Sequence, residues 1–238
     1  MTGSARRGTG FARRETTAVE LMDDPDCDPV LLGRTYAQFA VVNRLVSGWR
    51  RLYVSALRPV LAESDRPTLL DIGFGGGDIP RALAAWARRD GLDLAVTAID
   101  PDPRATAHVR RRRTGGVEFR SASSADLVAE GRRFDVVVSN HLLHHLEPAA
   151  LQQVLADSER LARRLALHND LRRSALAHGA YAVLTRPLAR SSFLHDDGLL
   201  SIRRSYRPHE LADVRPGWTA EPLGPFRLVL RHEPAGRP

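Results

Sequence analysis

Residues 69 to 78 read Leu69-Leu-Asp71-Ile-Gly73-Phe74-Gly75-Gly76-Gly77-Asp78, an apolar strand that runs into a glycine-rich turn and then into a helix. The glycines lack the Cβ atom that would keep a ligand away from the backbone, and they tolerate positive φ in the turn. A dinucleotide fingerprint, G-x-G-x-x-G, would require a glycine where this chain has Asp78. Because an acidic side chain at a helix start would repel a pyrophosphate, the turn suits a nucleotide-like ligand without phosphates.

A second strand pattern downstream supplies another acid. Leu94-Ala-Val-Thr-Ala-Ile-Asp100 is an apolar run whose final carboxylate falls about 25 residues after the glycine turn, near the spacing at which the acid of a second strand reaches ribose hydroxyls. The two stretches together predict a site for a ribose-bearing cofactor. An ordinary strand-to-helix turn in some other doubly wound protein is the structural alternative.

Strands and helices alternate along the chain from residue 66. Strand patterns cover 68–73, 93–100, 116–121, 134–140 and 164–169, and helical patterns cover 78–89, 102–112 and 148–163. Alternation of this kind predicts an α/β fold, a parallel sheet with helices on both faces. Two further strand-like stretches, 218–221 and 226–231, are separated by Pro222-Leu-Gly-Pro225 and are expected to pair antiparallel.

An acid, a GxGxG turn and a strand ending in aspartate, in this order, resemble the class I, Rossmann-like methyltransferases that depend on S-adenosyl-L-methionine (SAM). The resemblance spans residues 66–169 and implies a seven-stranded, mostly parallel sheet with an antiparallel terminal hairpin, and SAM as the cofactor. It also implies that Asp71 serves the methionine amino end, that the glycine turn lies against the cofactor and that Asp100 holds the ribose. The cofactor-binding residues expected on this basis are Asp71, Gly73, Phe74, Gly75, Gly77, Asp78, Asp100, Pro101, Ser123, Ser124, Asn140, Tyr36 and Arg50.

The chain departs from this family after the third predicted strand, where many members have an acid that contacts the adenine amino group. Here the matching stretch is Ser121-Ala-Ser123-Ser124-Ala-Asp126-Leu127, which has Ser123 at the position of the acid. The adenine contacts are therefore expected from Ser123, Ser124 or the neighbouring backbone.

Three histidines within five positions follow the fourth predicted strand, in Asn140-His141-Leu-Leu-His144-His145. Ligands of such sheets bind beyond the carboxyl ends of the strands. A histidine with a pKa of about 6.5 can take the proton of a phenol, pKa about 10, as the oxygen attacks. His141, His144 and His145 are candidate bases on these grounds, with metal binding and ordinary packing as alternatives. No further ligand pattern supports a metal, and none is expected.

A polar cluster, His168-Asn169-Asp170-Leu-Arg172-Arg173, follows the fifth predicted strand at the same edge of the sheet. Asp170 is expected either to orient a base or to bind the acceptor hydroxyl. A capping carboxylate paired with Arg172 or Arg173 is the equal alternative.

The segment before the core is expected to be helical. Asp28 is a suitable N-cap with Pro29 at the first helical position, and Gly48 is the expected break between two helices. The stretch from Tyr36 to Arg50 is similar to the segment that precedes the core in ubiquinone and menaquinone biosynthesis methyltransferases, where it forms a lid over cofactor and acceptor. A packed amphipathic face is the alternative for its aromatic residues.

The chain is expected to divide into a flexible segment at 1–27, a helical lid at 28–65 and a SAM-binding core at 66–238. An insertion at about 171–207 is longer than a normal connection and is expected to be a functional cover or a small helical insertion on the substrate side. Its apolar run, 175–188, is expected to wall an apolar acceptor site, to accept an alkyl tail or to touch a membrane surface.

Composition favours a cytoplasmic globular protein. Of the 238 residues, 43% are hydrophobic and 26% are charged, no window is apolar enough to span a membrane, and the first residues contain no secretory signal. The net charge of +7 would suit nucleic acid. However, the chain contains arginine but no lysine, a usage typical of a GC-rich genome. The sequence also contains no RNA-binding module, so nucleic acid is disfavoured as a partner.

The function expected is transfer of a methyl group from SAM to a small hydroxylated aromatic acceptor, a phenolic polyketide or a quinol. Methylation on oxygen is favoured because the histidines supply a base, although the same base would activate a ring carbon for methylation. An RNA methyltransferase, a non-catalytic partner subunit with the same fold and, least favoured, a nucleotide oxidoreductase are the rival functions. Homodimer formation and peripheral membrane contact remain open.

Overall fold

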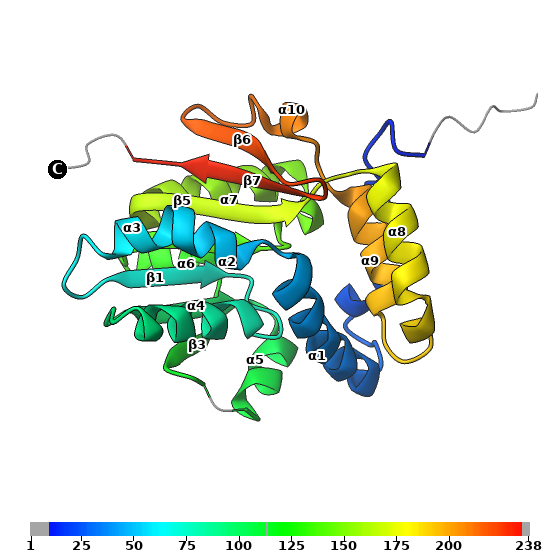
Figure 1. The fold of residues 1–238 in the computed structure, drawn as a ribbon, viewed down its shortest axis with the longest axis horizontal. Helices are drawn as coiled ribbons and strands as arrows, with labels where there is room; N and C mark the ends of the chain where they lie inside the picture. Colours follow the sequence, from blue (N-terminus) through cyan, green and yellow to red (C-terminus); the bar gives the residue numbers. More distant parts are fainter. Residues whose placement is uncertain (1–9, 113, 235–238) are drawn as a thin grey trace, which may run out of the picture.

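A seven-stranded sheet runs through the centre of the protein (Figure 1), in a computed structural model that describes residues 10–112 and 114–234. The strand order is β3-β2-β1-β4-β5-β7-β6. The strands are β1 Thr68–Ile72, β2 Ala95–Asp100, β3 Val117–Ser121, β4 Phe134–Asn140, β5 Ala162–Leu171, β6 Trp218–Leu223 and β7 Arg227–His232. The first five pair in parallel, whereas β7 pairs antiparallel with both β5 and β6. The predicted fold class, including the antiparallel terminal hairpin, is confirmed.

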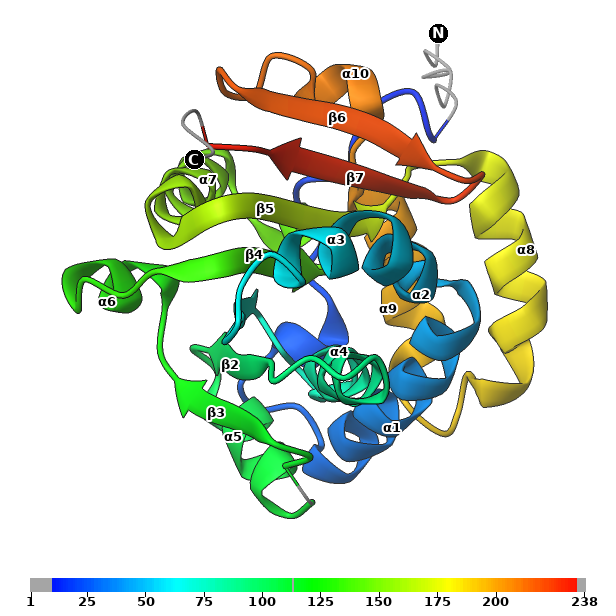
Figure 2. The same ribbon diagram turned by 60° about the vertical axis from the view of Figure 1, so that its left-hand side comes forward.

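Helices cover both faces of this sheet (Figure 2). The α-helices are α1 Pro29–Val46, α2 Trp49–Leu52, α3 Arg58–Leu61, α4 Asp78–Arg89, α5 Pro103–Arg110, α6 Ser124–Ala129, α7 Pro148–Leu161, α8 Ala175–Thr185, α9 Leu194–Arg204 and α10 Pro208–Leu211. Shorter turns are η1 Leu21–Asp23, η2 Tyr53–Leu57, η3 Leu143–His145 and η4 Arg186–Leu188. No helix among the described residues is both long and apolar enough to cross a membrane.

The alternation of side chains along the strands divides the core into two clusters. Leu69 of β1 packs with apolar residues of α2 to α5 on one face, and Leu70 packs with residues of α6, α7 and α10 on the other. Both leucines are fully buried. Because strands buried on both faces read as continuous apolar runs, the sheet could be recognised from the sequence.

The boundaries of two elements that shape the site follow from single residues. Asp28 caps α1, where its carboxylate accepts hydrogen bonds from the backbone N–H groups of Val30 and Leu31. Gly48 then interrupts the helical segment with φ of 74°, in the left-handed region where glycine is unstrained. The chain thus turns from α1 into α2 as the sequence predicted.

The insertion forms α8, η4 and α9, which lie beyond the carboxyl end of β5 beside α1 (Figure 1). It is tied to α1 by a hydrogen bond from the Phe193 backbone N–H to the Thr35 hydroxyl, 3.0 Å long. The apolar side chains of Leu176, Val183 and Leu184 on α8 are exposed. They do not line the cavity described below, so the expected apolar wall is not found on these three residues.

Residues 10–27 cross the carboxyl edge of the sheet and contact the insertion. The Glu15 backbone N–H donates to the Arg203 carbonyl over 3.1 Å, and the Leu21 N–H donates to the Asp197 carboxylate over 2.7 Å. These contacts were not expected from the sequence. The flexibility expected of 1–27 stays a prediction, and residues 1–9 lie outside the described part of the chain.

Helix α6 was not predicted. Ser123 and Asp126 form a capping box that starts it: each side chain bonds to the backbone N–H of the other residue. The helix is only six residues long, too short for its apolar period to be recognised.

Candidate active site

A cavity of about 380 Å³ lies at the carboxyl edge of the sheet, where β1, β2 and β4 end. Segments from the N-terminal part of the chain and from α1 close it on the outside. Its lining residues are Glu20, Met22, Asp23, Tyr36, Phe39, Asn43, Asp71, Gly73, Phe74, Gly75, Gly76, Asp78, Ile79, Asp100, Pro101, Asp102, Asn140, His141, Leu142, His144, His145 and Ser201. Most of the residues expected at the site therefore meet in one place.

The glycine turn after β1 forms one wall. Gly73, Gly75 and Gly77 have φ of 76°, 49° and 71°, all in the left-handed region. A Cβ atom on Gly73 would lie 3.2 Å from the Leu142 side chain, and one on Gly77 would lie 2.9 Å from Phe119. The positive φ favours glycine at all three positions, and the close neighbours of Gly73 and Gly77 leave little space for a side chain there. Phe74 is buried beneath it, edge to face with Phe119 at 4.9 Å.

Three carboxylates converge on the cavity. Asp71 ends β1 with only 1% of its surface exposed, Asp100 ends β2, and Asp78 starts α4. Burial raises the pKa of Asp71 well above its usual value, and the charges of Asp78 and Asp100 raise it further. Burial also raises the pKa values of Asp78 and Asp100, against the hydrogen bonds that these two accept. Concentrated buried negative charge of this kind is relieved by a cationic ligand.

The hydrogen bonds of these acids differ. Asp100 accepts from the backbone N–H groups of Gly75 and Asp102, each over 2.9 Å, so it holds the glycine turn in place. Asp78 accepts from the amide of Asn43 on α1 over 3.0 Å. Asp71 Oδ1 is buried and has no hydrogen-bond partner among the described residues. A buried oxygen without a partner is the atom most in need of a donor from a ligand.

A second polar cluster forms another wall of the cavity, built from η3 and backed by Asp170 at the end of β5. His144 Nδ1 lies 2.6 Å from Asp170 Oδ1, and the His144 backbone N–H donates to Asp170 Oδ2 over 2.9 Å. Burial acts to raise the pKa of Asp170, but the adjacent His144 outweighs it and the net shift is downward. Asp170 therefore orients a histidine, one of the two roles expected of it, and is not paired with Arg172 or Arg173.

His145 is held by two acids. Its Nδ1 lies 3.0 Å from Asp23 Oδ2 and its Nε2 lies 3.7 Å from Glu20 Oε2. Burial acts to lower its pKa, but Glu20 and Asp23 together raise the pKa to about 9. The imidazolium form of His145 is therefore favoured at neutral pH in the absence of another cation.

His141 has a different environment. Its φ of 56° lies in the left-handed region, and its Nε2 accepts a hydrogen bond from the Arg227 guanidinium. Burial and the charge of Arg227 hold its pKa well below the usual value. Asn140 beside it accepts from Trp49 Nε1 over 2.9 Å and from Arg227 Nη2 over 2.7 Å.

Four of the expected cofactor residues do not line the cavity: Gly77, Ser123, Ser124 and Arg50. The Ser123 hydroxyl bonds to Asp126 at the start of α6, and the buried Ser124 hydroxyl donates to Asp157 over 2.7 Å. Arg50 lies over the rings of Tyr53 and Trp86, at 5.4 and 5.3 Å, and faces a neighbouring cavity of about 720 Å³.

Sequence reasoning missed five polar residues of the cavity: Glu20, Asp23, Asn43, Asp102 and Ser201. They come from the N-terminal segment, from α1, from the start of α5 and from α9. None belongs to a short motif, and only long-range packing brings the four other than Asp102 to the strand ends. Asn43 was part of the quoted lid segment, but its bond to Asp78 has no signature in the sequence.

Comparison with known families identifies the central part of the chain. Residues 69–164, which include the glycine turn and both strand-end aspartates, match a family described as "Methyltransferase domain". The observed sheet ends in the antiparallel pair β7 and β6, as expected from the resemblance to the class I methyltransferases. Residues 69–164 are therefore similar to a methyltransferase domain, and the sheet that carries them has this class I arrangement.

Curated relatives match the chain over a limited stretch. The ubiquinone biosynthesis O-methyltransferase of Methylobacterium sp. (strain 4-46) is 36% identical over 87 residues, 35% of this chain and 32% of the relative. The enzyme of the same name from Cereibacter sphaeroides (strain ATCC 17025 / ATH 2.4.3) is 33% identical over 33% of this chain and 30% of its own length. The matched region thus spans about a third of these relatives.

Solved structures share the fold over most of the chain. The plantazolicin methyltransferase BpumL, in complex with a pentazolic desmethylPZN analog and SAH, is 13% identical with a TM-score of 0.61, covering 90% of this chain and 93% of that one. An O-methyltransferase family protein from Burkholderia thailandensis is 18% identical with a TM-score of 0.55, covering 86% of this chain and 61% of that one.

Proposed function

We propose that the protein transfers the methyl group of SAM to the hydroxyl of a small hydroxylated aromatic acceptor, a phenolic polyketide or a quinol. The observation that carries the proposal is the convergence of Asp71, Asp78 and Asp100 with the glycine turn in one cavity. SAM brings a sulfonium and an ammonium group and no phosphate. Its charge is complementary to three buried carboxylates whose pKa values burial raises.

In this proposal each wall of the cavity has a defined task. Asp71 receives the methionine ammonium, which would give its unpaired Oδ1 a donor. The turn from Gly73 to Gly77, with Phe74, Asp78 and Asn140, surrounds the rest of the methionine end. Asp100 and Pro101 hold the ribose. The adenine contacts fall to Tyr36 and to the backbone near Ser123, because the serine hydroxyls already have partners.

The acceptor is proposed to bind on the side of η3. The Asp170 carboxylate fixes the ring of His144, so that His144 Nε2 is available to take a phenol proton. His145 and His141 flank it, and Phe39 supplies an apolar surface for an aromatic ring. Because the sulfonium is already activated, alignment and exclusion of water provide most of the rate. The names of the two curated relatives favour oxygen over ring carbon as the methylated atom.

Calorimetric titration with S-adenosylhomocysteine (SAH) tests the cofactor site. Asp71→Asn and Asp100→Ala should each weaken SAH binding about 30-fold or more, because each removes a buried charged partner of the ligand. Without ligand, Asp71→Asn should melt at or above the temperature of the wild type. Burial raises the pKa of Asp71 in the native state, so this carboxyl group destabilises the native state at neutral pH. The asparagine of the variant would not ionise and would remove that cost.

Asp93→Asn is the matched control, an exposed carboxylate just before β2 at the opposite end from Asp100. It should leave SAH affinity unchanged. SAH affinities of the Asp71 and Asp100 variants within threefold of the wild type would refute the proposed cofactor site.

Radiolabelled SAM and a panel of phenols and quinols test the acceptor. Mass spectrometry of the product should locate the new methyl group on oxygen. Methylation of a ring carbon would retain the enzyme class and reject the favoured atom.

A further inference from the structure

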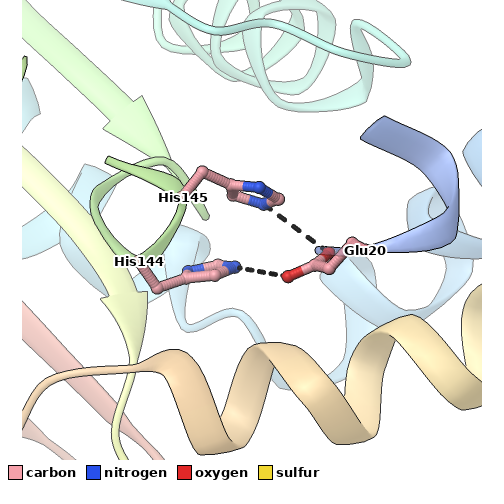
Figure 3. A group of neighbouring side chains, drawn as sticks. All are labelled: Glu20, His144 and His145. Carbon is pink, nitrogen blue, oxygen red and sulfur yellow. Dashed lines mark ion pairs between the residues drawn. The ribbon is translucent and has the colours of Figure 1, made fainter. Parts of the chain in front are cut away.

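Glu20, His144 and His145 form a compact cluster in the lining of the cavity (Figure 3). Glu20 precedes η1, and both histidines belong to η3. His144 Nε2 lies 3.6 Å from Glu20 Oε1, and His145 Nε2 lies 3.7 Å from Glu20 Oε2. One ligand-type atom from each of the three residues lies within 4.8 Å of the other two.

Both imidazole rings are oriented by a second carboxylate. His144 Nδ1 is 2.6 Å from Asp170, and His145 Nδ1 is 3.0 Å from Asp23. When Nδ1–H donates to a carboxylate, the lone pair of a neutral imidazole is on Nε2. Both Nε2 atoms face Glu20 (Figure 3). Carboxylates paired with histidines in this way are the usual outer support of a metal-ligating histidine.

His144 Nε2 has no hydrogen-bond partner among the described residues, although the side chain is only 1% exposed. Its distance to Glu20 is too long for a hydrogen bond. Glu20 is itself held in place, because the Ser201 hydroxyl donates to its Oε1 over 2.8 Å. A buried acceptor atom aimed at a fixed carboxylate is not explained by the contacts of the protein alone.

The charge around the cluster is also that of a cation site. Three carboxylates, those of Glu20, Asp23 and Asp170, surround the two histidines. The nearby guanidinium groups of Arg14 and Arg204 donate to the backbone carbonyls of His144 and His145. These arginines fix the position of η3 through its backbone carbonyls. In these hydrogen bonds they do not use the carboxylate and imidazole atoms of the cluster.

We propose that Glu20, His144 and His145 bind a divalent metal ion of the zinc type. Ligands about 2.0–2.2 Å from zinc at tetrahedral angles lie roughly 3.4 Å apart. The observed 3.6 and 3.7 Å run to the two different oxygens of Glu20, and one atom from each residue lies within 4.8 Å of the others. The side chains must therefore close by up to about 1.4 Å around an ion. Two imidazoles and one carboxylate suit Zn²⁺ better than Mg²⁺ or Ca²⁺, which prefer oxygen ligands.

Three protein ligands leave a fourth coordination position, as in catalytic zinc sites. All three residues line the cavity that also contains Asp71 and Asp100, so this position is open to a ligand in the cavity. Where the proposed function holds, that ligand is the acceptor hydroxyl. The metal would then lower the pKa of the hydroxyl, and the histidines would hold the ion in place of taking the proton.

Metal binding to the full chain tests the site. The protein is stripped with a chelator, titrated with Zn²⁺ against a competing chelator, and assayed for zinc by mass spectrometry after gel filtration. We expect one ion per chain. Glu20→Gln, His144→Asn and His145→Asn should each weaken binding at least tenfold, whereas His209→Asn, which changes an exposed histidine on α10, should not. Asp170→Asn should weaken binding about 10- to 100-fold, because it removes an outer carboxylate.

Absence of stoichiometric zinc in the wild type, or binding that all three ligand variants retain, overturns the proposal. If a ligand variant fails to fold, the absorption spectrum of the wild type with Co²⁺ decides: a band of four- or five-coordinate cobalt supports the site, and the spectrum of the hydrated ion refutes it. SAH binding to the stripped protein is measured in parallel. Its loss would count against the proposed cofactor site and not against the metal site.

Discussion

The two walls of the cavity are both rich in carboxylates, but they are built in different ways. On the glycine-turn wall, Asp71 and Asp100 end adjacent strands, and Gly75 and Asp100 are 25 residues apart. On the η3 wall, Asp23 and His145 are 122 residues apart and meet only because the N-terminal segment crosses the sheet edge. The first wall is therefore local in sequence, and the second is a product of tertiary packing.

The walls also differ in charge. Burial raises the pKa values of the acids of the glycine-turn wall, and for Asp78 and Asp100 it outweighs the lowering by the charges of Arg81 and Arg104. On the η3 wall Asp170 is paired with His144, and its pKa is lowered. We infer that the glycine-turn wall binds the cationic part of a ligand, whereas the η3 wall takes part in proton transfer or metal binding.

His144→Asn should separate the two walls most strongly. Loss of His144, as the proposed base or as the proposed metal ligand, should lower kcat by about 10²- to 10⁴-fold, while SAH affinity stays within twofold because His144 belongs to the other wall. Steady-state kinetics and calorimetry on the same preparation measure both. A parallel loss of SAH affinity would show that the walls are not independent. His178→Asn, a substitution on α8 outside the cavity lining, is the control.

A smaller effect, on the stability of the protein at acidic pH, is expected from His168, which lies on β5 behind the η3 wall. His168 is buried, shares a 2.7 Å hydrogen bond with Ser139 and stacks on Trp218. Burial lowers its pKa to about 4. Histidine in the unfolded chain has a pKa of about 6.5, so below this pH the unfolded chain binds the proton more readily than the native state does. Stability is therefore lost as the pH falls from about 6.5 towards 4.

Urea unfolding at pH 7 and pH 5 measures this effect. The wild type should lose about 2 kcal/mol more than His168→Gln over this range. Equal losses in the two proteins would mean that His168 is not the acid-sensitive group of this strand.

The glycine-turn wall could be predicted closely because local signals agree there. Helix α4 was predicted at 78–89 and β4 at 134–140, and both are found at these residues. A continuous apolar run marks each buried strand, and the glycines mark the turn that starts α4. Each signal lies within the element that it specifies.

The η3 wall could be predicted only in part. The histidines and Asp170 were found because they directly follow predicted strands. Glu20 was not, since the segment that carries it has no periodicity and its position depends on Ser201 of α9. No further ligand pattern in the sequence supported a metal, and Glu20, the third residue of the proposed site, comes from a distant segment.

A crystal structure of the SAH complex tests the central claim most directly. The account predicts that the SAH amino group lies within hydrogen-bond distance of the Asp71 carboxylate and that the ribose hydroxyls lie on Asp100. SAH bound in the neighbouring cavity beside Arg50, or bound without contact to either aspartate, would contradict it.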